Sequence, residues 1–561
     1  MKERYLTLME KALSAYTDEH ILRYYQDVKE HGMTEHGFPR LTANIGILIA
    51  HGKRTDLLPL FCSMMELCCD MFLRPYVHAA NEFSVREIVC CIHELEEAEI
   101  IDEEVLSRWK EKISAIRPEA CYTVLVQSET DPITNWAIFG AVSEYARFTF
   151  GLGGDLDFVD RQLSCQLPWL DENGMYCDNP KEIPHQPIIY DYASRGLFAM
   201  LLHFGYHGAY CRQLDDCLRR SGRLTLAMQS SNGEVPFGGR SNQFLHNEPW
   251  MTLLFEYEAR RYAKEGNREL SALFKAAAVR GLDVTETWLD KDPIRHIKNR
   301  FPTETKYGCE GYAYFDKYMI TVASNLYAAY LLCDDTIPTV AVADRAPTAC
   351  QTSHRFHKLF LKSGGYALEF DTDGDPHYDA SGLGRIHREG APSAICLSCP
   401  CPSEPLYETN RESPFAFSLC SALREGDAWR FGAEPCVSYE VIGHGTDEAE
   451  AYGELLCRFP NGQSTREKHR VGAYGVSVTL EGKGEIGYTL PALCFDGESS
   501  PEILAEEHSL TVRYGGFCCR YVTDGRVIDS GRIAANRNGH YRVFLATAEN
   551  RLQVRIEITK I

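Results

Sequence analysis

The stretch YLLCDDTIPTVAVADRAPTAC (330–350) divides this chain of 561 residues into two parts with different residue patterns. Before it, apolar residues recur every three or four positions, which is the spacing of amphipathic helices. After it, short β-branched and aromatic runs alternate with glycine, aspartate and asparagine turns, as in antiparallel strands. The sequence therefore predicts a multidomain α+β protein, with one domain over residues 1–335 and another over 336–561.

The first part predicts about twelve helices joined by turn signals such as DENG (171–174) and SNGEVPFGG (231–239). No fixed-period repeat is visible, so a regular solenoid is not indicated. An (α/α) toroid accommodates this number of helices and their long connections. The helical stretches lie near residues 1–30, 40–53, 56–73, 83–97, 103–116, 132–149, 156–170, 188–206, 209–229, 246–265, 267–289 and 309–333.

The second part contains strand-like runs such as HKLFLKSGGYALEFDTDGD (357–375), GVSVTLEGKGEIGYTL (475–490) and LQVRIEITK (552–560). Short strands joined by turns of a few residues are typical of an antiparallel β-sandwich. We therefore expect an N-terminal (α/α) toroid followed by a C-terminal antiparallel β-sandwich.

Composition narrows the range of partners. The chain has 58 Lys and Arg against 79 Asp and Glu, a formal charge of −21, which argues against nucleic acid or an anionic membrane as a partner. No apolar run reaches the length of a membrane span, and the start of the chain has no signal-peptide core. Because no export signal is visible, we expect the 22 cysteines to be reduced thiols and the protein to be cytoplasmic. A homo-oligomer is compatible with the sequence.

Two helix starts carry residues with two interpretations each. Asn135 and Trp136 open a helix, either as a cap beside a core ring or as an amide that binds an anion and a ring that stacks on a sugar. Tyr312 lies in the tyrosine-rich segment 306–319. It is either part of a core stripe or a second ring for stacking on a sugar.

The loop and helix start around residue 190 carry His185, Tyr190 and Tyr192. Asp191 and Arg195 follow at a spacing of four, which predicts an ion pair. Tyr190 could be a phenolic acid or base if a nearby cation lowered its pKa from about 10. The alternative is an aromatic residue packed on the core at the helix start.

The segment SSNGEVPFGGRSNQFLHNEPW (230–250) concentrates Arg240, Asn242, His246, Glu248 and Trp250 after its two adjacent glycines. It is either a polar surface loop or a site for a carboxylated sugar, because an arginine guanidinium binds a carboxylate through two hydrogen bonds.

A long loop predicted in the second part, residues 371–398, carries His377, Arg385 and His387. Long loops without regular structure are often functional. His377, Asp379 and His387 could also hold a divalent metal, although their spacing matches no strong template.

A toroid followed by an antiparallel sandwich resembles the heparinase II/III-like polysaccharide lyases and their toroid relatives that act on hyaluronan, chondroitin, alginate and gellan. Local motifs also resemble this group. DENGMYCDNP (171–180) followed by HQPIIYDY (185–192) is similar to its turn and tyrosine-bearing helix, which implies that Tyr190 is the catalytic tyrosine. Asn135 then corresponds to the residue that neutralises the substrate carboxylate, and His377 to a histidine supplied by the sandwich.

The resemblance implies β-elimination at a uronic acid without a required cofactor. Whether a divalent metal also takes part is left open by the sequence. Asn135 and Arg240 would stabilise the enolate, while Tyr190 acts as acid and base with His246 or His377 as its partner. The group's usual histidine after the asparagine is Trp136 here, so His185 or His246 would replace it. The further substrate contacts expected are Trp136, His185, Tyr192, Asn242, Glu248, Trp250, Tyr312, Arg385 and His387.

The expected substrate is an imported oligosaccharide that contains a uronate. Two alternatives stay open, a non-catalytic carbohydrate-binding protein and a toroid glycoside hydrolase similar to unsaturated-glucuronyl hydrolases. The hydrolase would use two carboxylates, for which the candidates are Asp178, Asp191, Glu234 and Glu248. For a lyase, we expect the four toroid groups Asn135, Tyr190, Arg240 and His246 to line one cleft, with His377 approaching from the sandwich.

Overall fold

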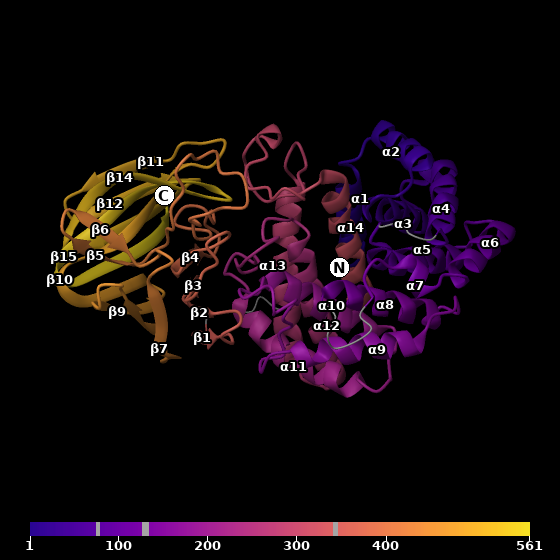
Figure 1. Cartoon of the computed structure of the whole chain (residues 1–561), viewed down its shortest axis with the longest axis horizontal. Coiled ribbons are helices and arrows are strands. Elements are labelled where there is room, and N and C mark those ends of the chain that lie inside the picture. Colours follow the sequence, from indigo (N-terminus) through magenta and orange to yellow (C-terminus); the bar gives the residue numbers. More distant parts are fainter. Residues whose placement is uncertain (75–78, 126–133, 340–345) are drawn as a thin grey trace.

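The computed structural model describes residues 1–74, 79–125, 134–339 and 346–561. A helical half and a sheet half lie next to each other along the longest axis (Figure 1). The α-helices in the described residues are α1 (Lys2–Leu13), α2 (Asp18–His31), α3 (Gly37–Ala50), α4 (Leu58–Phe72), α5 (Val85–Glu97), α6 (Glu103–Ser114), α7 (Pro118–Cys121), α8 (Asn135–Thr149), α9 (Leu156–Gln166), α10 (Ile188–His203), α11 (Cys211–Met228), α12 (Asn247–Lys264), α13 (Arg268–Leu289) and α14 (Phe315–Leu332).

These fourteen helices differ from the twelve expected ones in two places. The stretch 1–30 holds two helices, because the Thr17 side chain caps a new helix by accepting a hydrogen bond from the backbone of His20. A single turn, α7, begins at Pro118 and was not expected. Residues 132 and 133 of one expected helix lie outside the described ranges.

Six helices form a closed inner ring. Helices α3, α5, α8, α10, α12 and α14 each pack against the next, and α14 packs back against α3. The inner helices are buried almost all round, as α3 shows with every residue from Gly37 to Ile49 buried. Helices α1, α4, α9, α11 and α13 pack outside the ring against its members. This arrangement confirms the (α/α) toroid.

The sheet half contains two antiparallel sheets that share one hydrophobic core. One sheet has the order β1-β2-β3-β4, and the other is built on the long pair β10 and β15. The strands are β1 (Thr348–Gln351), β2 (Lys358–Ser363), β3 (Tyr366–Asp371), β4 (Gly382–Arg388), β5 (Ser421–Glu425), β6 (Ala428–Phe431), β7 (Ser438–Thr446), β8 (Ala451–Arg458), β9 (Ser464–Gly472), β10 (Gly475–Phe495), β11 (Glu502–Glu506), β12 (Ser509–Tyr514), β13 (Phe517–Thr523), β14 (Arg526–Asn536) and β15 (Gly539–Lys560).

The predicted order of helices followed by antiparallel sheets is therefore confirmed. The last helix ends at Leu332 and the first strand begins at Thr348, so the expected division at 335/336 falls between them. Residues 340–345 of that stretch lie outside the described ranges. In the described part of the chain, no helix has both the length and the apolar character needed to cross a membrane. All 22 cysteines fall in the described ranges and are free thiols.

The ion pair expected within α10 is present and fully buried. Arg195 Nε donates to Asp191 Oδ1 at 2.8 Å, and both side chains have 0% exposure. Asp191 Oδ1 also accepts from the backbone of Tyr176 at 2.7 Å. The pair therefore joins the inner helix to the turn that precedes it.

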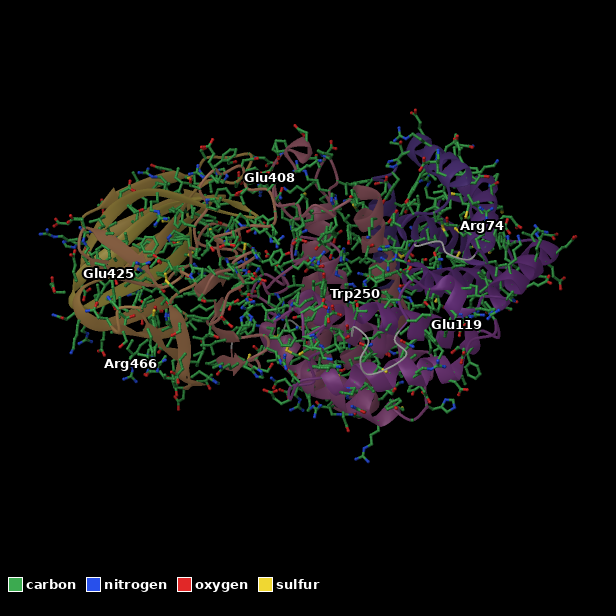
Figure 2. All side chains as sticks on the ribbon, viewed as in Figure 1. Arg74, Glu119, Trp250, Glu408, Glu425 and Arg466 are labelled. Carbon is green, nitrogen blue, oxygen red and sulfur yellow. The ribbon has the colours of Figure 1, made fainter. Side chains whose placement is uncertain are left out.

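Replacing Arg195 with leucine should lower the free energy of unfolding by about 3–5 kcal/mol, because a buried Asp191 would lose its partner. Urea unfolding followed by circular dichroism measures the change. The matched control is Arg466→Leu, which breaks an exposed pair with Glu454 on the sheet half (Figure 2) and should cost under about 1 kcal/mol. Equal losses in the two variants would contradict the prediction.

Candidate functional site

A cavity of about 390 Å³ opens at one end of the ring, where the inner helices begin. Its walls include Arg40 of α3, Asn135 of α8, Tyr190 of α10, Trp250 of α12 and Tyr318 of α14, all within the first turns of their helices. The backbone N–H groups of helix starts carry partial positive charge. Their convergence makes this end of the ring favourable for an anion.

The charged side chains of the cavity also favour an anion. Its described lining contains the cations Arg40, Arg240 and Lys317 but one carboxylate, Asp178. Arg40 pairs with a buried glutamate. Arg240 lies over the Tyr312 ring, 4.5 Å from its centroid, and makes no ion pair with a carboxylate in the described residues. A chain of charge −21 thus has a locally positive cavity.

Arg240 is placed by a turn in an uncommon backbone conformation. Gly239 and Ser241 on either side have φ values of 73° and 66°, in the left-handed region. The turn is held at both ends by buried carboxylates. Gly239 N donates to Asp379 Oδ2 at 2.6 Å, and Ser241 N donates to Glu310 Oε1 at 3.0 Å.

One arginine of the sheet half completes this support. Arg537, in the turn between β14 and β15, donates from Nη2 to Glu310 Oε1 at 3.0 Å and to the Gly239 carbonyl at 3.3 Å. Its Nη1 donates to Gln243 Oε1, and its guanidinium lies 4.1 Å from the centroid of the Tyr407 ring. We call this buried arrangement of Arg537 and Glu310 around the turn the Arg537 clamp. The sheet half therefore fixes the position of Arg240.

Tyr190 is half-buried on the first turn of α10 and faces this cation. Burial raises the pKa of Tyr190 to about 12, while the Arg240 charge and a hydrogen bond with Ser241 act in the opposite direction. The phenol is therefore protonated at neutral pH, and Arg240 stabilises its anion if the proton leaves.

Asp178 is a further ionisable group of the cavity with a strongly shifted pKa. Asn135 N donates to its Oδ1 at 2.7 Å, and its own backbone N donates to Gln186 Oε1 at 2.6 Å. Burial raises the pKa of Asp178 to about 7, although the Asn135 hydrogen bond and the Arg240 charge oppose that rise. Sequence reasoning considered this residue only as one carboxylate of a hydrolase.

Two neutral imidazoles line the cavity. The His246 ring lies nearly parallel to the stacked rings of Phe244 and Tyr318, with centroids 5.2 and 5.7 Å away, and His36 stacks on Phe83 at 4.8 Å. Burial lowers the pKa of both histidines well below the usual value. In the described structure, Nδ1 of each ring is buried without a hydrogen-bond partner. With these lowered pKa values, both imidazoles are uncharged at neutral pH.

The structure brings half of the sequence-derived candidates to this cavity. The candidates that line the cavity are Asn135, Trp136, Tyr190, Arg240, His246, Trp250 and Tyr312. The four groups expected to converge are among them. Their catalytic roles stay predictions.

Three candidates are internal residues that cannot contact a ligand in the cavity. Tyr192 has 0% exposure, with the Arg195 guanidinium 5.2 Å from its ring centroid. Glu248 is also fully buried and accepts from Lys298 Nζ at 2.6 Å. His387 lies within β4 with 1% exposure. Each is removed from the set of substrate contacts, because packing leaves no surface for a substrate.

Four other candidates lie elsewhere. His185 Nε2 is 3.5 Å from Asp373 Oδ2 at the boundary between the halves. His377 is half-exposed, its Nδ1 lies 2.9 Å from the Glu404 carbonyl oxygen, and it does not line the cavity. Asn242 and Arg385 line a second cavity, described below. Within the described ranges, no three His, Cys, Asp or Glu side chains gather as metal ligands would, so His377, Asp379 and His387 do not form such a group.

Sequence reasoning did not select several residues that line the cavity. His36 lies between the expected helices 1–30 and 40–53, and Lys317 and Tyr318 lie in the tyrosine-rich segment 306–319, where only Tyr312 was selected. Their shared feature is a position just before or within the first turn of an inner helix. Once the ring is assigned, that position is a signal that could have identified them.

No protein-family model and no curated protein matches the chain. Among solved structures, a heparinase III is 8% identical, with 85% of this chain and 77% of that chain covered and a TM-score of 0.36. The heparan sulfate lyase HepC from Pedobacter heparinus is 8% identical, with 89% and 76% covered and a TM-score of 0.31. A glycosyl hydrolase of family 88 from Bacteroides vulgatus is 13% identical, with 59% and 98% covered and a TM-score of 0.38. The group named by the resemblance is thus among the matches, and we draw no function from these likenesses.

The shifted pKa of Asp178 predicts a pH effect on stability. Below about pH 4 this carboxyl is protonated in both the folded and the unfolded chain. As the pH rises towards 7, only the unfolded chain ionises it, so the folded state loses stability by about 1.4 kcal/mol per unit of pKa difference. Asp178→Asn should remove this loss and gain stability relative to the wild type between about pH 4 and 7.

Thermal unfolding across that pH range measures the effect. Asp427→Asn, at an exposed turn, serves as the control and should follow the wild-type curve. Parallel curves for Asp178→Asn and the wild type would show that Asp178 has an ordinary pKa.

Proposed function

We propose that the protein is a lyase that cleaves uronic-acid-containing oligosaccharides by β-elimination and leaves a 4,5-unsaturated uronosyl end. The observation that carries this proposal is the Tyr190 phenol beside Arg240, whose guanidinium has no carboxylate partner in the described residues, in a cavity with Asn135. A substrate carboxylate would supply the missing partner. The fold alone would not support this choice, because folds host many functions.

Carboxylate binding is the first step of the proposed mechanism. The Arg240 guanidinium can hold the uronate carboxylate through two hydrogen bonds, and the Asn135 amide donates a further one. The helix starts around the cavity add favourable partial charges. When the C5 proton leaves, negative charge spreads onto the carboxylate, so these same groups stabilise the enolate more than the ground state.

Proton transfer then involves two neutral groups. His246 accepts the C5 proton, since its ring lines the cavity and its imidazole is unprotonated there. Tyr190 donates its proton to the leaving O4, which is consistent with a pKa of about 12. The C5–H and C4–O4 bonds break, the C4–C5 double bond forms, and no water is consumed.

The hydrolase alternative is less well supported by the geometry. Paired-carboxylate hydrolysis requires two carboxylates across the scissile bond, whereas Asp178 is the one carboxylate in the described lining of the cavity. Asp191 is held by Arg195, and Glu248 by Lys298. Glu234 lines the second cavity instead.

Incubation with a panel of uronate oligosaccharides tests the proposal. A lyase produces near-ultraviolet absorbance and products whose summed mass equals that of the substrate. Tyr190→Phe should lower kcat by about 10²–10⁴-fold, because the proton donor is lost. The control Tyr314→Phe, at a residue that is 64% exposed, should keep full activity. Products that gain the mass of water, or an active Tyr190→Phe, would reject the assignment.

The Arg537 clamp should affect activity without touching the substrate. Arg537→Gln should lower kcat/KM by about 10–100-fold, because Arg240 is then less well positioned, and Arg537→Lys should recover only part of it, since lysine cannot reproduce the guanidinium's several contacts. Arg532→Gln, an exposed change on the same hairpin, is the matched control. A clamp that acts only on stability would lower the melting temperature of Arg537→Gln with kcat/KM unchanged.

A further inference from the structure

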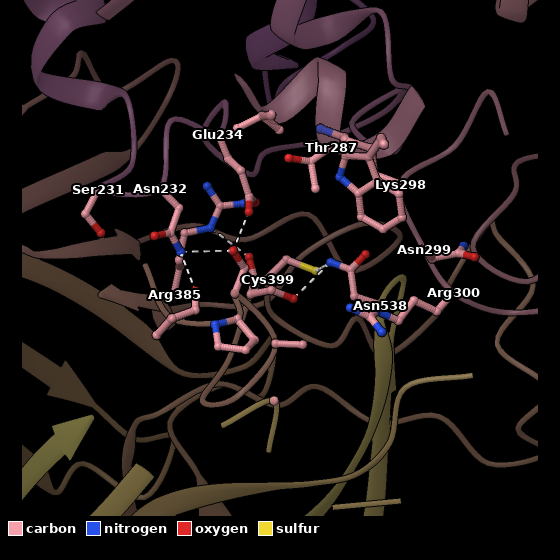
Figure 3. A pocket seen from close by; sticks show the side chains of 18 of the residues that line it. Ser231, Asn232, Glu234, Thr287, Lys298, Asn299, Arg300, Arg385, Cys399 and Asn538 are labelled. Atoms are coloured by element: carbon pink, nitrogen blue, oxygen red, sulfur yellow. Dashed lines mark hydrogen bonds between the residues drawn. The ribbon is translucent and has the colours of Figure 1, made fainter. Parts of the chain in front are cut away.

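A second cavity, of about 590 Å³, lies between the helical half and the sheet half (Figure 3). Its walls come from α13, from the loop 231–243, from residues 298–300, and from loops and hairpins of the sheet half. Asn242 and Gln243 line this cavity, whereas the preceding Arg240 and Ser241 line the first one. The loop therefore forms a wall shared by two separate cavities.

The lining of the second cavity is rich in neutral hydrogen-bonding groups around one large ring. The amide and hydroxyl side chains are Ser231, Asn232, Asn242, Gln243, Thr287, Asn299, Ser393, Ser398, Tyr514 and Asn538. Trp288 of α13 is half-buried beside them. The indole ring can pack on the apolar face of a ligand, and the amide and hydroxyl side chains can donate and accept hydrogen bonds. This combination suits a ligand with many hydroxyl groups.

Charge distinguishes this cavity from the first. Three of its basic side chains are each balanced by a buried carboxylate behind the wall, in the pairs Lys298–Glu248, Arg385–Glu369 and Arg537–Glu310. Arg300 is paired with Asp496 and Glu498, and Asp283 with Arg4. The other charged side chains of the lining are Glu234, Arg280, Lys291 and Glu389. Five of the nine charged side chains in the described lining are thus compensated by partners within the protein. An uncharged ligand suits such a cavity, because it leaves these ion pairs intact.

A buried donor in the wall points to a ligand. Gln243 is 4% exposed, and its Oε1 accepts from Arg537 while its Nε2 has no partner in the described residues. The hydroxyl of Ser231 is also buried without a partner there. A buried polar group left without a hydrogen bond costs about 1–3 kcal/mol. A hydroxyl-bearing ligand in the cavity would satisfy both groups.

We propose that this second cavity is a binding site for a neutral sugar ring, stacked on Trp288 and hydrogen-bonded by Gln243 and the surrounding amides. The inference does not depend on the proposed lyase activity, because none of its groups takes part in the proton transfers. The two cavities would then select different sugars, an acidic one at Arg240 and a neutral one at Trp288.

Isothermal titration of the full chain with N-acetylglucosamine and with sodium glucuronate tests this site. N-acetylglucosamine should bind the wild type, and Trp288→Ala should weaken that binding about tenfold, since the stacking surface is lost. Trp288→Phe retains a ring and should weaken binding less. Arg240→Gln should leave N-acetylglucosamine binding unchanged and weaken the binding of glucuronate instead.

A second variant guards against misfolding of Trp288→Ala. Thr287→Arg, at an exposed position on the cavity wall, places a long side chain in the cavity and should weaken N-acetylglucosamine binding at least as much as Trp288→Ala does. The proposal is overturned if the wild type does not bind N-acetylglucosamine, if Trp288→Ala and Thr287→Arg bind it normally, or if Arg240→Gln abolishes its binding. Absence of lyase products would reject the proposed function and leave these binding outcomes unaffected.

Discussion

The buried ion pair between Glu310 and Arg537 is the contact on which the cavity depends. Glu310 belongs to the helical half and Arg537 to a hairpin of the sheet half, and both are almost fully excluded from solvent. A buried charge without its partner is strongly destabilising, so separating the two side chains would cost the protein a large part of its stability. Because the pair also holds the backbone of Gly239 and Ser241, the two halves and the turn between them have one mutual arrangement.

That arrangement produces a local field opposite to that of the whole chain. Helix starts, Arg240 and Lys317 surround the cavity, while its one described carboxylate, Asp178, has a pKa of about 7 and is partly protonated. Burial also keeps His246 uncharged. A cavity with these properties attracts an anion and yet contains neutral groups that can exchange protons with it, a combination that net charge does not reveal.

Sequence reasoning was most successful where the relevant signal is local. Helical spacing identified the toroid, and the i,i+4 rule identified the pair of Asp191 and Arg195. Tyr190 was predicted as the catalytic tyrosine, and Tyr192 as a substrate contact from the same helix start. Residues two apart on a helix point to different faces, so one reaches the cavity and the other is buried in the core.

Contacts between residues far apart in the sequence could not be predicted from local sequence patterns. Arg537 and Glu310 are 227 positions apart, and neither segment has a local pattern that names the other. His36 was missed for a related reason, since it joins the site only because α14 packs back against α3 and closes the ring.

The sheet half reaches the first cavity's supporting turn through few side chains, chiefly Arg537 at the tip of one hairpin and Asp379 in one loop. The sheet half should therefore tolerate substitutions unequally along its strands. Strand surfaces remote from the tip need only preserve a packed core and can drift in sequence, whereas the length and twist of β14 and β15 must be inherited together with the loop that they meet.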